Sequence, residues 1–192
     1  MNNAPADTRA TREQVLGWLD DVMDPEVPVV SVVGLGIVRD VIWMNTHGDG
    51  VMAGGTGSAW LQVVVTPTYS GCPATEVIAA SIRESLRGHG IANVEVATRL
   101  SPAWTTDWMS PQARDALRAY GIAPPMERVA NADGSQVVDI AALLSPGTRV
   151  AVPCPQCGSS RTRLLSQFGS TACKALYQCN SCLEPFDYFK PH

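Results

Sequence analysis

The residues with the clearest chemistry in this chain are cysteines, and four of the six stand in two matched pairs near the end of the sequence. The stretch "CPQC" supplies Cys154 and Cys157, and "CNSC" supplies Cys179 and Cys182. Two residues between paired cysteines let both sulfurs face one ion, and two such turns complete a tetrahedron of thiolates. Because four thiolates leave no open coordination position, the spacing predicts a metal site with a structural role.

Zinc is the metal that this ligand pattern favours, and iron in a rubredoxin-like cage is the chemical alternative, since tetrahedral sulfur suits both metals. A second alternative is four free thiols, against which the doubled motif argues. A module of about 40 residues buries too little apolar surface to be stable alone, so we expect Zn²⁺ to stabilise it. Cys173, in "STACKA", is expected to be a buried small hydrophobe outside the ligand set, unless it replaces one of the four ligands.

Cys72 is the solitary cysteine, and it stands far from the others in the stretch "TPTYSGCPATEV". Pro73 suits the first position of a helix, which predicts Cys72 at the N-cap. Free backbone N–H groups and the positive end of the helix dipole would favour a thiolate there, as a nucleophile or as a ligand for a soft metal. The alternative is a buried cap cysteine without chemistry.

A nucleophilic thiolate needs a base nearby, and the chain has only three histidines. His89 falls at the far end of the helix that follows Cys72, roughly 25 Å away at 1.5 Å per residue. His47 lies in a glycine-rich stretch, and His192 stands at the end of the tail. None of the three is placed as a partner for Cys72, which argues against a cysteine hydrolase or acyltransferase.

The elements that must position these cysteines follow from hydrophobic periodicity, which predicts helices over 11–23, 73–87 and 110–120 and strands over 36–44, 58–66 and 92–100. This order predicts an α+β fold, a two-layer sandwich with helices on one side of a mixed sheet. The predicted domains are residues 1–121, a linker over 122–147 with one helical turn at 140–144, and a small four-cysteine module over 148–192.

The charge of the chain limits its partners. The formal net charge is −4 and the sequence pI is about 5.3, whereas binding to nucleic-acid phosphates draws on clustered Lys and Arg. No apolar stretch approaches the roughly 20 residues of a membrane-spanning helix, and the first residues do not have the pattern of an export signal. We therefore expect a cytoplasmic protein with neither nucleic-acid nor membrane partners.

Several stretches taken together resemble the family of phenylacetyl-CoA epoxidase D subunits (PaaD): "DPEVPVVSV", "LGIV", "TPTYSGCPA", "SPAWTTDWMS", "FGSTACKALYQC" and "CLEPFDYFK". The resemblance runs from about Thr11 to Lys190, and its front part, 1–121, is similar to the SufT-like iron–sulfur assembly factors. It implies a two-layer α+β front domain in which Cys72 is the motif cysteine and Asp24-Pro25-Glu26 is the acidic motif. It also implies a zinc-ribbon-like C-terminal module.

The resemblance implies an accessory subunit of the oxygenase that epoxidises phenylacetyl-CoA in aerobic phenylacetate degradation, not the catalyst itself. The implied partners are the reductase and oxygenase subunits, and the implied task is to mature or deliver the iron–sulfur cluster of the reductase. Cys72, Asp24 and Glu26 are then candidates to hold a transient cluster. Because a cluster needs four ligands, the others would come from a second copy in a homodimer, from small thiols or from the client. The alternative is a purely structural assembly subunit without metal transfer.

One departure from the family pattern concerns the residues before the first strand. This chain has Gly34-Leu35-Gly36 where related sequences read Asp-Leu-Gly, so an acidic side chain is missing at Gly34. If that acid bound a metal or a partner, its role must fall to Asp24 or Glu26, or be lost. The loop at 45–57 is also longer than the family pattern.

Overall fold

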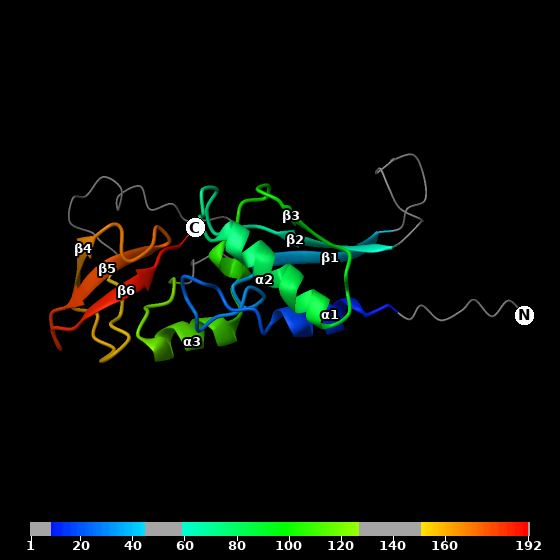
Figure 1. The fold of residues 1–192 in the computed structure, drawn as a ribbon. Helices are drawn as coiled ribbons and strands as arrows, with labels where there is room; N and C mark the ends of the chain where they lie inside the picture. Colours follow the sequence, from blue (N-terminus) through cyan, green and yellow to red (C-terminus); the bar gives the residue numbers. More distant parts are fainter. Residues whose placement is uncertain (1–8, 45–58, 127–150, 192) are drawn as a thin grey trace, which may run out of the picture. The chain divides into compact units, whose positions relative to one another are not determined.

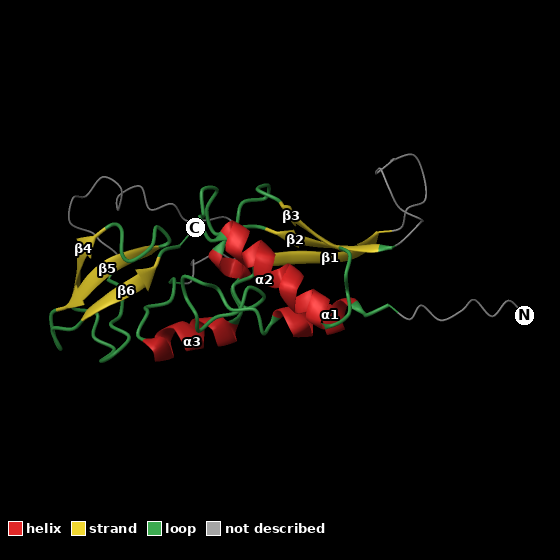
Figure 2. Cartoon of the chain, in the orientation of Figure 1, coloured by secondary structure: helices red, strands yellow, loops and turns green. Residues whose placement is uncertain are grey.

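The computed structural model describes residues 9–44, 59–126 and 151–191, which fall into two compact units. The front unit runs up to Trp104, and the tail unit begins at Thr105. Figure 1 traces the chain through both units, and Figure 2 marks their helices and strands. Because each unit has its own sheet, the two are described separately.

The front unit is built on a three-stranded mixed sheet with the strand order β1-β2-β3. Strand β1 (Val38–Met44) runs antiparallel to β2 (Trp60–Val65), and β2 runs parallel to β3 (Val94–Thr98). The antiparallel pair follows a direct connection, whereas the parallel pair needs a crossover, which helix α2 (Thr75–Gly88) provides. The mixed sheet predicted from the sequence is confirmed.

Two helices complete the front unit. Helix α1 (Arg12–Leu19) packs on α2 and β1, and α2 packs on β3 (Figure 1). Apolar side chains from both helices and from the central strand are buried in this layer, at Val15, Leu19, Ile78, Ile82, Leu86, Leu61 and Val63. This arrangement confirms the two-layer α+β class. None of the helices in the described part of the chain combines the length and apolar character that crossing a membrane requires.

Helix α1 begins as predicted and ends earlier than predicted. The Thr11 backbone N–H donates to Gln14 Oε1 (2.8 Å), and the Gln14 N–H donates to Thr11 Oγ1 (3.3 Å), which forms a capping box. The helix was expected to reach residue 23, but it ends at Leu19. Beyond the helix the chain turns back on itself. The Asp24 N–H donates to the Val30 carbonyl (2.9 Å), and Met23 and Ser31 form an isolated antiparallel β-bridge.

The tail unit contains a short 3₁₀ helix, η1 (Thr106–Trp108), and helix α3 (Pro111–Tyr120), followed by three strands. Helix α3 matches its prediction: Ser110 caps it with a bond from the Ala113 N–H (3.1 Å), and Gly121 ends it at φ +93°. The strands β4 (Thr162–Ser166), β5 (Lys174–Cys179) and β6 (Pro185–Phe189) form an antiparallel sheet in that order.

The tail unit begins earlier in the chain than the predicted cysteine module. Helix α3 was expected to close the first domain at residue 121, yet it belongs to the compact unit that starts at Thr105. The Ala123 N–H donates to the Asp187 carbonyl (2.8 Å), and Ala123 accepts from the Phe189 N–H (2.9 Å), so Ala123 pairs alongside β6. The start of the predicted linker is therefore part of the tail unit. The rest of that linker, including the helical turn at 140–144, lies outside the described residues.

Candidate functional site

The tail unit brings together the four cysteines that were predicted to bind a metal. The sulfurs of Cys154, Cys157, Cys179 and Cys182 all lie within 4.8 Å of one another. Cys154 and Cys182 are 3.7 Å apart, and Cys157 and Cys179 are 3.6 Å apart. Four sulfurs placed tetrahedrally at about 2.3 Å from one ion are about 3.8 Å from each other. The donor set and its spacing therefore fit a single thiolate-bound metal ion.

Two similar turns carry these ligands. In the first, the Gly158 N–H donates to the Cys154 carbonyl (2.9 Å), and in the second, the N–H groups of Ser181 and Cys182 donate to Cys179 Sγ (3.3 and 3.5 Å). Each turn is followed by a residue in the left-handed region, Gly158 at φ +72° and Leu183 at φ +67°. Glycine adopts this region without strain, whereas leucine does so only at a cost. The left-handed Leu183 was not predicted, although the parallel between "CPQCG" and "CNSCL" was the available signal.

One cysteine of each pair lies in the core of the tail unit. Cys154 and Cys179 are buried in a cluster that includes Val152, Ala175 and Phe186, whereas Cys157 and Cys182 are exposed. Backbone N–H groups, first that of Cys182 and then that of Ser181, lower the pKa of Cys179 to about 6. Cys179 is therefore the ligand most readily present as the thiolate that binds a metal, whereas burial and the other three sulfurs raise the pKa of Cys182 to about 12.

Cys173 lies outside this cluster, as the sequence predicted. Its side chain is buried at 3% exposure, and its sulfur is 3.0 Å from Thr171 Oγ1. Within the described ranges, the four paired cysteines are the only group of three or more potential ligands close enough to share an ion. The structure therefore keeps Cys173 as a packed side chain of the tail unit.

Cys72 lies in the turn between β2 and α2, and it is half-buried. Its N–H donates to the Tyr69 carbonyl (3.2 Å), and its carbonyl accepts from the N–H and hydroxyl of Thr75 (3.3 and 2.9 Å). The prediction that Cys72 is the N-cap of the helix is wrong, because α2 begins at Thr75 and its N-cap is Ala74. Cys72 thus stands just ahead of the helix end, with its backbone held by the turn.

The environment of Cys72 disfavours the thiolate, contrary to the prediction from a helix N-terminus. Burial raises the pKa of the thiol most, and the negative charges of Glu26 and Asp24 raise it further. A hydrogen bond with the Ala74 backbone and one with the Tyr69 side chain oppose this shift without cancelling it. At neutral pH, the free thiol is therefore protonated.

The acidic motif has a structural task of its own. Asp24 is buried, and its Oδ1 accepts from the N–H groups of Glu26 (2.8 Å) and Val27 (2.9 Å), which closes the turn around Pro25. The structure brings Asp24 and Glu26 near enough to Cys72 to act on its charge. These three residues do not form a ligand group of the kind found in the tail.

Gly34, where this chain lacks the acidic residue of the family pattern, lies in the loop that follows the turn around Pro25. The Gly34 N–H donates to Ser31 Oγ (2.8 Å), and the Ser31 hydroxyl in turn donates to Asp20 Oδ1. The sequence did not indicate this pair, because Asp20 was expected inside a helix. The carboxylate of Asp20 therefore anchors the loop that carries Gly34 through the Ser31 hydroxyl.

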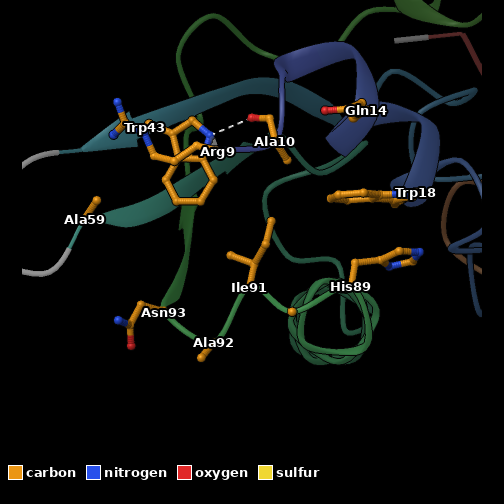
Figure 3. Close-up of a pocket in the computed structure, with 11 residues that line it drawn as sticks. Arg9, Ala10, Gln14, Trp18, Trp43, Ala59, His89, Ile91, Ala92 and Asn93 are labelled. Atoms are coloured by element: carbon orange, nitrogen blue, oxygen red, sulfur yellow. Dashed lines mark hydrogen bonds between the residues drawn. The ribbon is translucent and has the colours of Figure 1, made fainter. Parts of the chain in front are cut away.

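The described histidine, His89, is not a base for Cys72. It follows the last residue of α2, whereas Cys72 precedes the first, so the length of the helix separates them. Its ring stacks on Trp18 with centroids 4.4 Å apart, and Nδ1 lies 2.9 Å from the Ser85 carbonyl. Figure 3 shows this pair at the edge of a pocket of about 560 Å³ that also includes Trp43 and Asn93. His47 and His192 lie outside the described residues.

Two family models match this chain, one in each part. The model described as "Iron-sulfur cluster assembly protein" matches residues 12–98, which hold the front sheet, its helices and Cys72. The model described as "PaaD zinc beta ribbon domain" matches residues 142–190, which hold the four paired cysteines. The first match lies within the front unit, and the second covers the strands of the tail unit.

Relatives were found both for most of the chain and for the front part alone. The chain is 46% identical over 177 residues to the "Putative 1,2-phenylacetyl-CoA epoxidase" D subunit of Escherichia coli (strain K12), and the match covers 92% of this chain and 91% of that protein. It is 32% identical over 109 residues to the Fe-S protein maturation auxiliary factor YitW of Bacillus subtilis (strain 168), covering 56% and 94%. The crystal structure of a domain of unknown function, DUF59, from Bacillus anthracis shares 26% identity at a TM-score of 0.45, covering 55% and 90%.

Proposed function

The chain belongs to the family of phenylacetyl-CoA epoxidase D subunits, and from this premise we propose that it is an accessory component of such an oxygenase. Its work is to mature or deliver the iron–sulfur cluster of the reductase component, while the epoxidation itself takes place on other subunits. The front match to an iron–sulfur assembly family and the relative named as an Fe-S maturation factor support this task. The protein acts in the cytoplasm, where thiols stay reduced.

The four tail cysteines, in this proposal, hold one structural Zn²⁺. The distances between their sulfurs fit tetrahedral coordination, and two of the ligands are part of the apolar core. A bound ion would tie the two turns together and supply folding free energy that a small sheet lacks. Metal analysis of the purified protein tests this directly, because one zinc per chain without visible colour is expected, whereas iron would show absorption.

The front cysteine, Cys72, is the proposed point of transfer. The observation that carries this proposal is that its side chain is only half-buried and has no complete set of metal ligands around it. Cys72 reaches solvent, unlike the buried Cys173, and the described residues around it supply no closed set of ligands. Its raised pKa means that binding iron must displace a proton, which weakens the hold on the metal. A carrier that must release its cargo needs such weak retention, and the remaining ligands come from a second copy, small thiols or the client.

The test is the cluster content of the reductase produced together with this protein. Cys72→Ser should keep the fold and the tail metal while the reductase loses most of its iron and sulfide, measured by absorption and elemental analysis. Ser70→Ala is a matched control, because Ser70 is an exposed neighbour in the same turn and its loss leaves the sulfur in place. Full cluster occupancy with Cys72→Ser would eliminate the transfer role.

A purely structural role is the second candidate, and it is favoured by the structural task of Asp24, which closes the turn around Pro25. In that case the chain would bridge subunits of the oxygenase without handling metal. Stoichiometric purification with the oxygenase, together with normal epoxidase activity from Cys72→Ser, would select this function over transfer.

A further inference from the structure

The edge strands of the two sheets differ in how they are protected. An open strand edge offers unpaired N–H and C=O groups to other chains, and bulges or covering segments guard against this. Strands β1 and β4 each have a bulge-type register shift, at Val38/Asp40 and at Leu164/Ser166, and Ala123 pairs alongside β6. Strand β3, the outer strand of the front sheet, pairs with β2 in unbroken register. Among the described strands, β3 is therefore the edge with neither a bulge nor a covering segment.

Three residues of β3 direct their backbone groups away from β2. The Asn93 carbonyl accepts from the Leu61 N–H (2.9 Å), and the Arg99 N–H donates to the Val65 carbonyl (2.8 Å). Because backbone groups alternate in direction along a strand, every second residue between these two ends also bonds to β2. The residues whose N–H and C=O groups point outward are Val94, Val96 and Thr98. Within the described ranges, no backbone hydrogen bond satisfies these groups.

This edge is complementary to a second copy of itself. In an antiparallel pair centred on Val96, the outward groups of Val96 would exchange both hydrogen bonds with Val96 of the second copy. Val94 of each copy would do the same with Thr98 of the other, so every outward N–H and C=O group would gain a partner. A two-fold symmetric interface requires such reciprocal pairing.

The charges beside this edge also fit a second copy. Glu95 and Arg99 are exposed, and neither forms an ion pair with another described residue. Glu95 accepts from Gln62 Nε2 (3.0 Å), so it lies on the face of the sheet and not across its edge. In the register centred on Val96, Glu95 lies opposite Ala97 of the second copy and not opposite a like charge. Arg99 of each copy is then the diagonal neighbour of Glu95 in the other, within reach of long side chains.

We propose that the outer edge of β3 is the interface of a homodimer, in which two copies join their front sheets antiparallel about Val96. Backbone pairing supplies the attraction, and the two Arg99–Glu95 contacts between the copies fix the register. The strand has only five residues, so the interface is small and the dimer dissociates on dilution. The dimer itself does not depend on the function proposed for Cys72.

The dimer decides among the sources of ligands for Cys72, and this step rests on the proposed function. Strands β2 and β3 run parallel with Val65 paired to Thr98, so the turn that carries Cys72 follows the Thr98 end of the sheet. Antiparallel pairing places Thr98 of one copy beside Val94 of the other. The two Cys72 sites therefore lie at opposite ends of the paired strands. The second copy does not complete either site, which leaves small thiols or the client.

Sedimentation equilibrium of the full-length chain tests the dimer. The wild type should pass from monomer to dimer as its concentration rises. Val96→Pro should weaken dimerisation at least about tenfold, because proline has no N–H and the two central hydrogen bonds are lost. The N–H of Val96 bonds to no residue of β2, so the front sheet keeps its own ladder. A wild type that stays monomeric at about 0.2 mM would overturn the proposal.

Charge reversal tests the register and the identity of the partner. Glu95→Arg and Arg99→Glu should each weaken self-association about fivefold at low salt, and less at high salt. An equimolar mixture of the two variants should associate as the wild type does, because unlike copies restore both diagonal pairs. Glu84→Arg, at an exposed position of α2, is the matched control and should leave self-association unchanged. A mixture that associates no better than its components contradicts this register.

Hydrogen exchange and cluster loading separate the dimer from the alternatives. The amides of Val94 and Thr98 should exchange slowly at high protein concentration and fast on dilution. Slow exchange in a monomer would show that another part of the chain covers the edge, and it would remove the dimer. Val96→Pro should load the reductase as well as the wild type does. Loss of loading in this variant, with Cys72 intact, would contradict the placement of the Cys72 sites at opposite ends. If the wild type itself loads no cluster, the proposed transfer fails while sedimentation still decides the dimer.

Discussion

The front unit and the tail unit place the cysteine thiol in two different environments. In the tail, four sulfurs converge within 4.8 Å. Backbone N–H groups lower the pKa of Cys179 to about 6, while burial and the other three sulfurs raise that of Cys182 to about 12. In the front unit, one sulfur stands half-buried beside two carboxylates, and its pKa is raised. Four convergent sulfurs suit permanent binding of one ion, whereas a single thiol suits the transient binding proposed for Cys72. The surroundings of each cysteine, more than its presence, therefore decide what it can do.

The strongest test of this contrast removes a tail ligand. Cys179→Ser should weaken metal binding by more than about 100-fold, because even changes around the ligands of a metal commonly cost about 10–100-fold. The tail unit should then lose protection from proteolysis, since this sulfur is buried in its core. Metal content and limited proteolysis measure the two effects.

Cys173→Ser is the control for that experiment, because it changes a buried cysteine outside the cluster. It should retain the metal in full. Loss of metal from Cys173→Ser would place Cys173 among the ligands and break the contrast between the two regions.

The front acidic motif offers the next largest effect. Asp24→Ala should lower the free energy of unfolding of the front unit by about 3 kcal/mol, because it leaves two backbone N–H groups without their charged acceptor. Asp24→Asn should cost about 1 kcal/mol, since its amide oxygen still accepts hydrogen bonds. Tryptophan fluorescence during urea unfolding follows mainly this unit, which holds Trp18, Trp43, Trp60 and Trp104, whereas Trp108 belongs to the tail unit. Equal stability of the two variants would mean that Asp24 does not close the turn.

The two left-handed residues after the cysteine turns should respond in opposite directions. Gly158→Ala should destabilise the tail by about 1 kcal/mol, because a Cβ is strained at φ +72° although the space around it is open. Leu183→Gly should stabilise it by about 0.5 kcal/mol, since relief of strain exceeds the entropy that glycine adds to the unfolded chain. Thermal unfolding of the metal-bound protein compares them. A loss of stability in Leu183→Gly would show that its exposed side chain contributes packing.

The smallest effect concerns the charge beside Cys72. Its pKa is raised first by burial and then by Glu26, so Glu26→Gln removes a charge that disfavours the thiolate. The midpoint of the alkylation rate of Cys72 should therefore move to lower pH, measured with iodoacetamide and mass spectrometry. Glu76→Gln, in the first turn of α2, is the control and should leave the midpoint unchanged. An unchanged midpoint in Glu26→Gln would remove Glu26 from the electrostatics of this site.

The features that were predictable from the sequence depend on neighbours along the chain. The capping box of Thr11 and Gln14, the Ser110 cap and the glycine end of α3 each follow from residues within one helical turn. The cysteine cluster was predictable because the chemistry of one ion demands four ligands. The start of α2 was missed, since Pro73 suits a turn before a helix as well as its first position.

Other features depend on residues that are distant in the sequence, and these could not be predicted. The early end of α1 goes with the pairing of Met23 with Ser31, and no local sequence pattern indicates that pairing. The raised pKa of Cys72 comes first from burial in the folded protein and then from the charges of Glu26 and Asp24 in another loop. The grouping of α3 with the tail depends on where Ala123 pairs, and a single alanine carries no signal of that kind.

The pairing of Ala123 with β6 also defines how small an excised tail can be. A fragment cut at residue 148 would keep every metal ligand, but it would leave the outer edge of β6 without its two backbone partners. An uncovered strand edge is a template for other chains, so such a fragment would be prone to self-association. A tail fragment that starts at Thr105, where the compact unit begins, includes Ala123 and so keeps this edge satisfied.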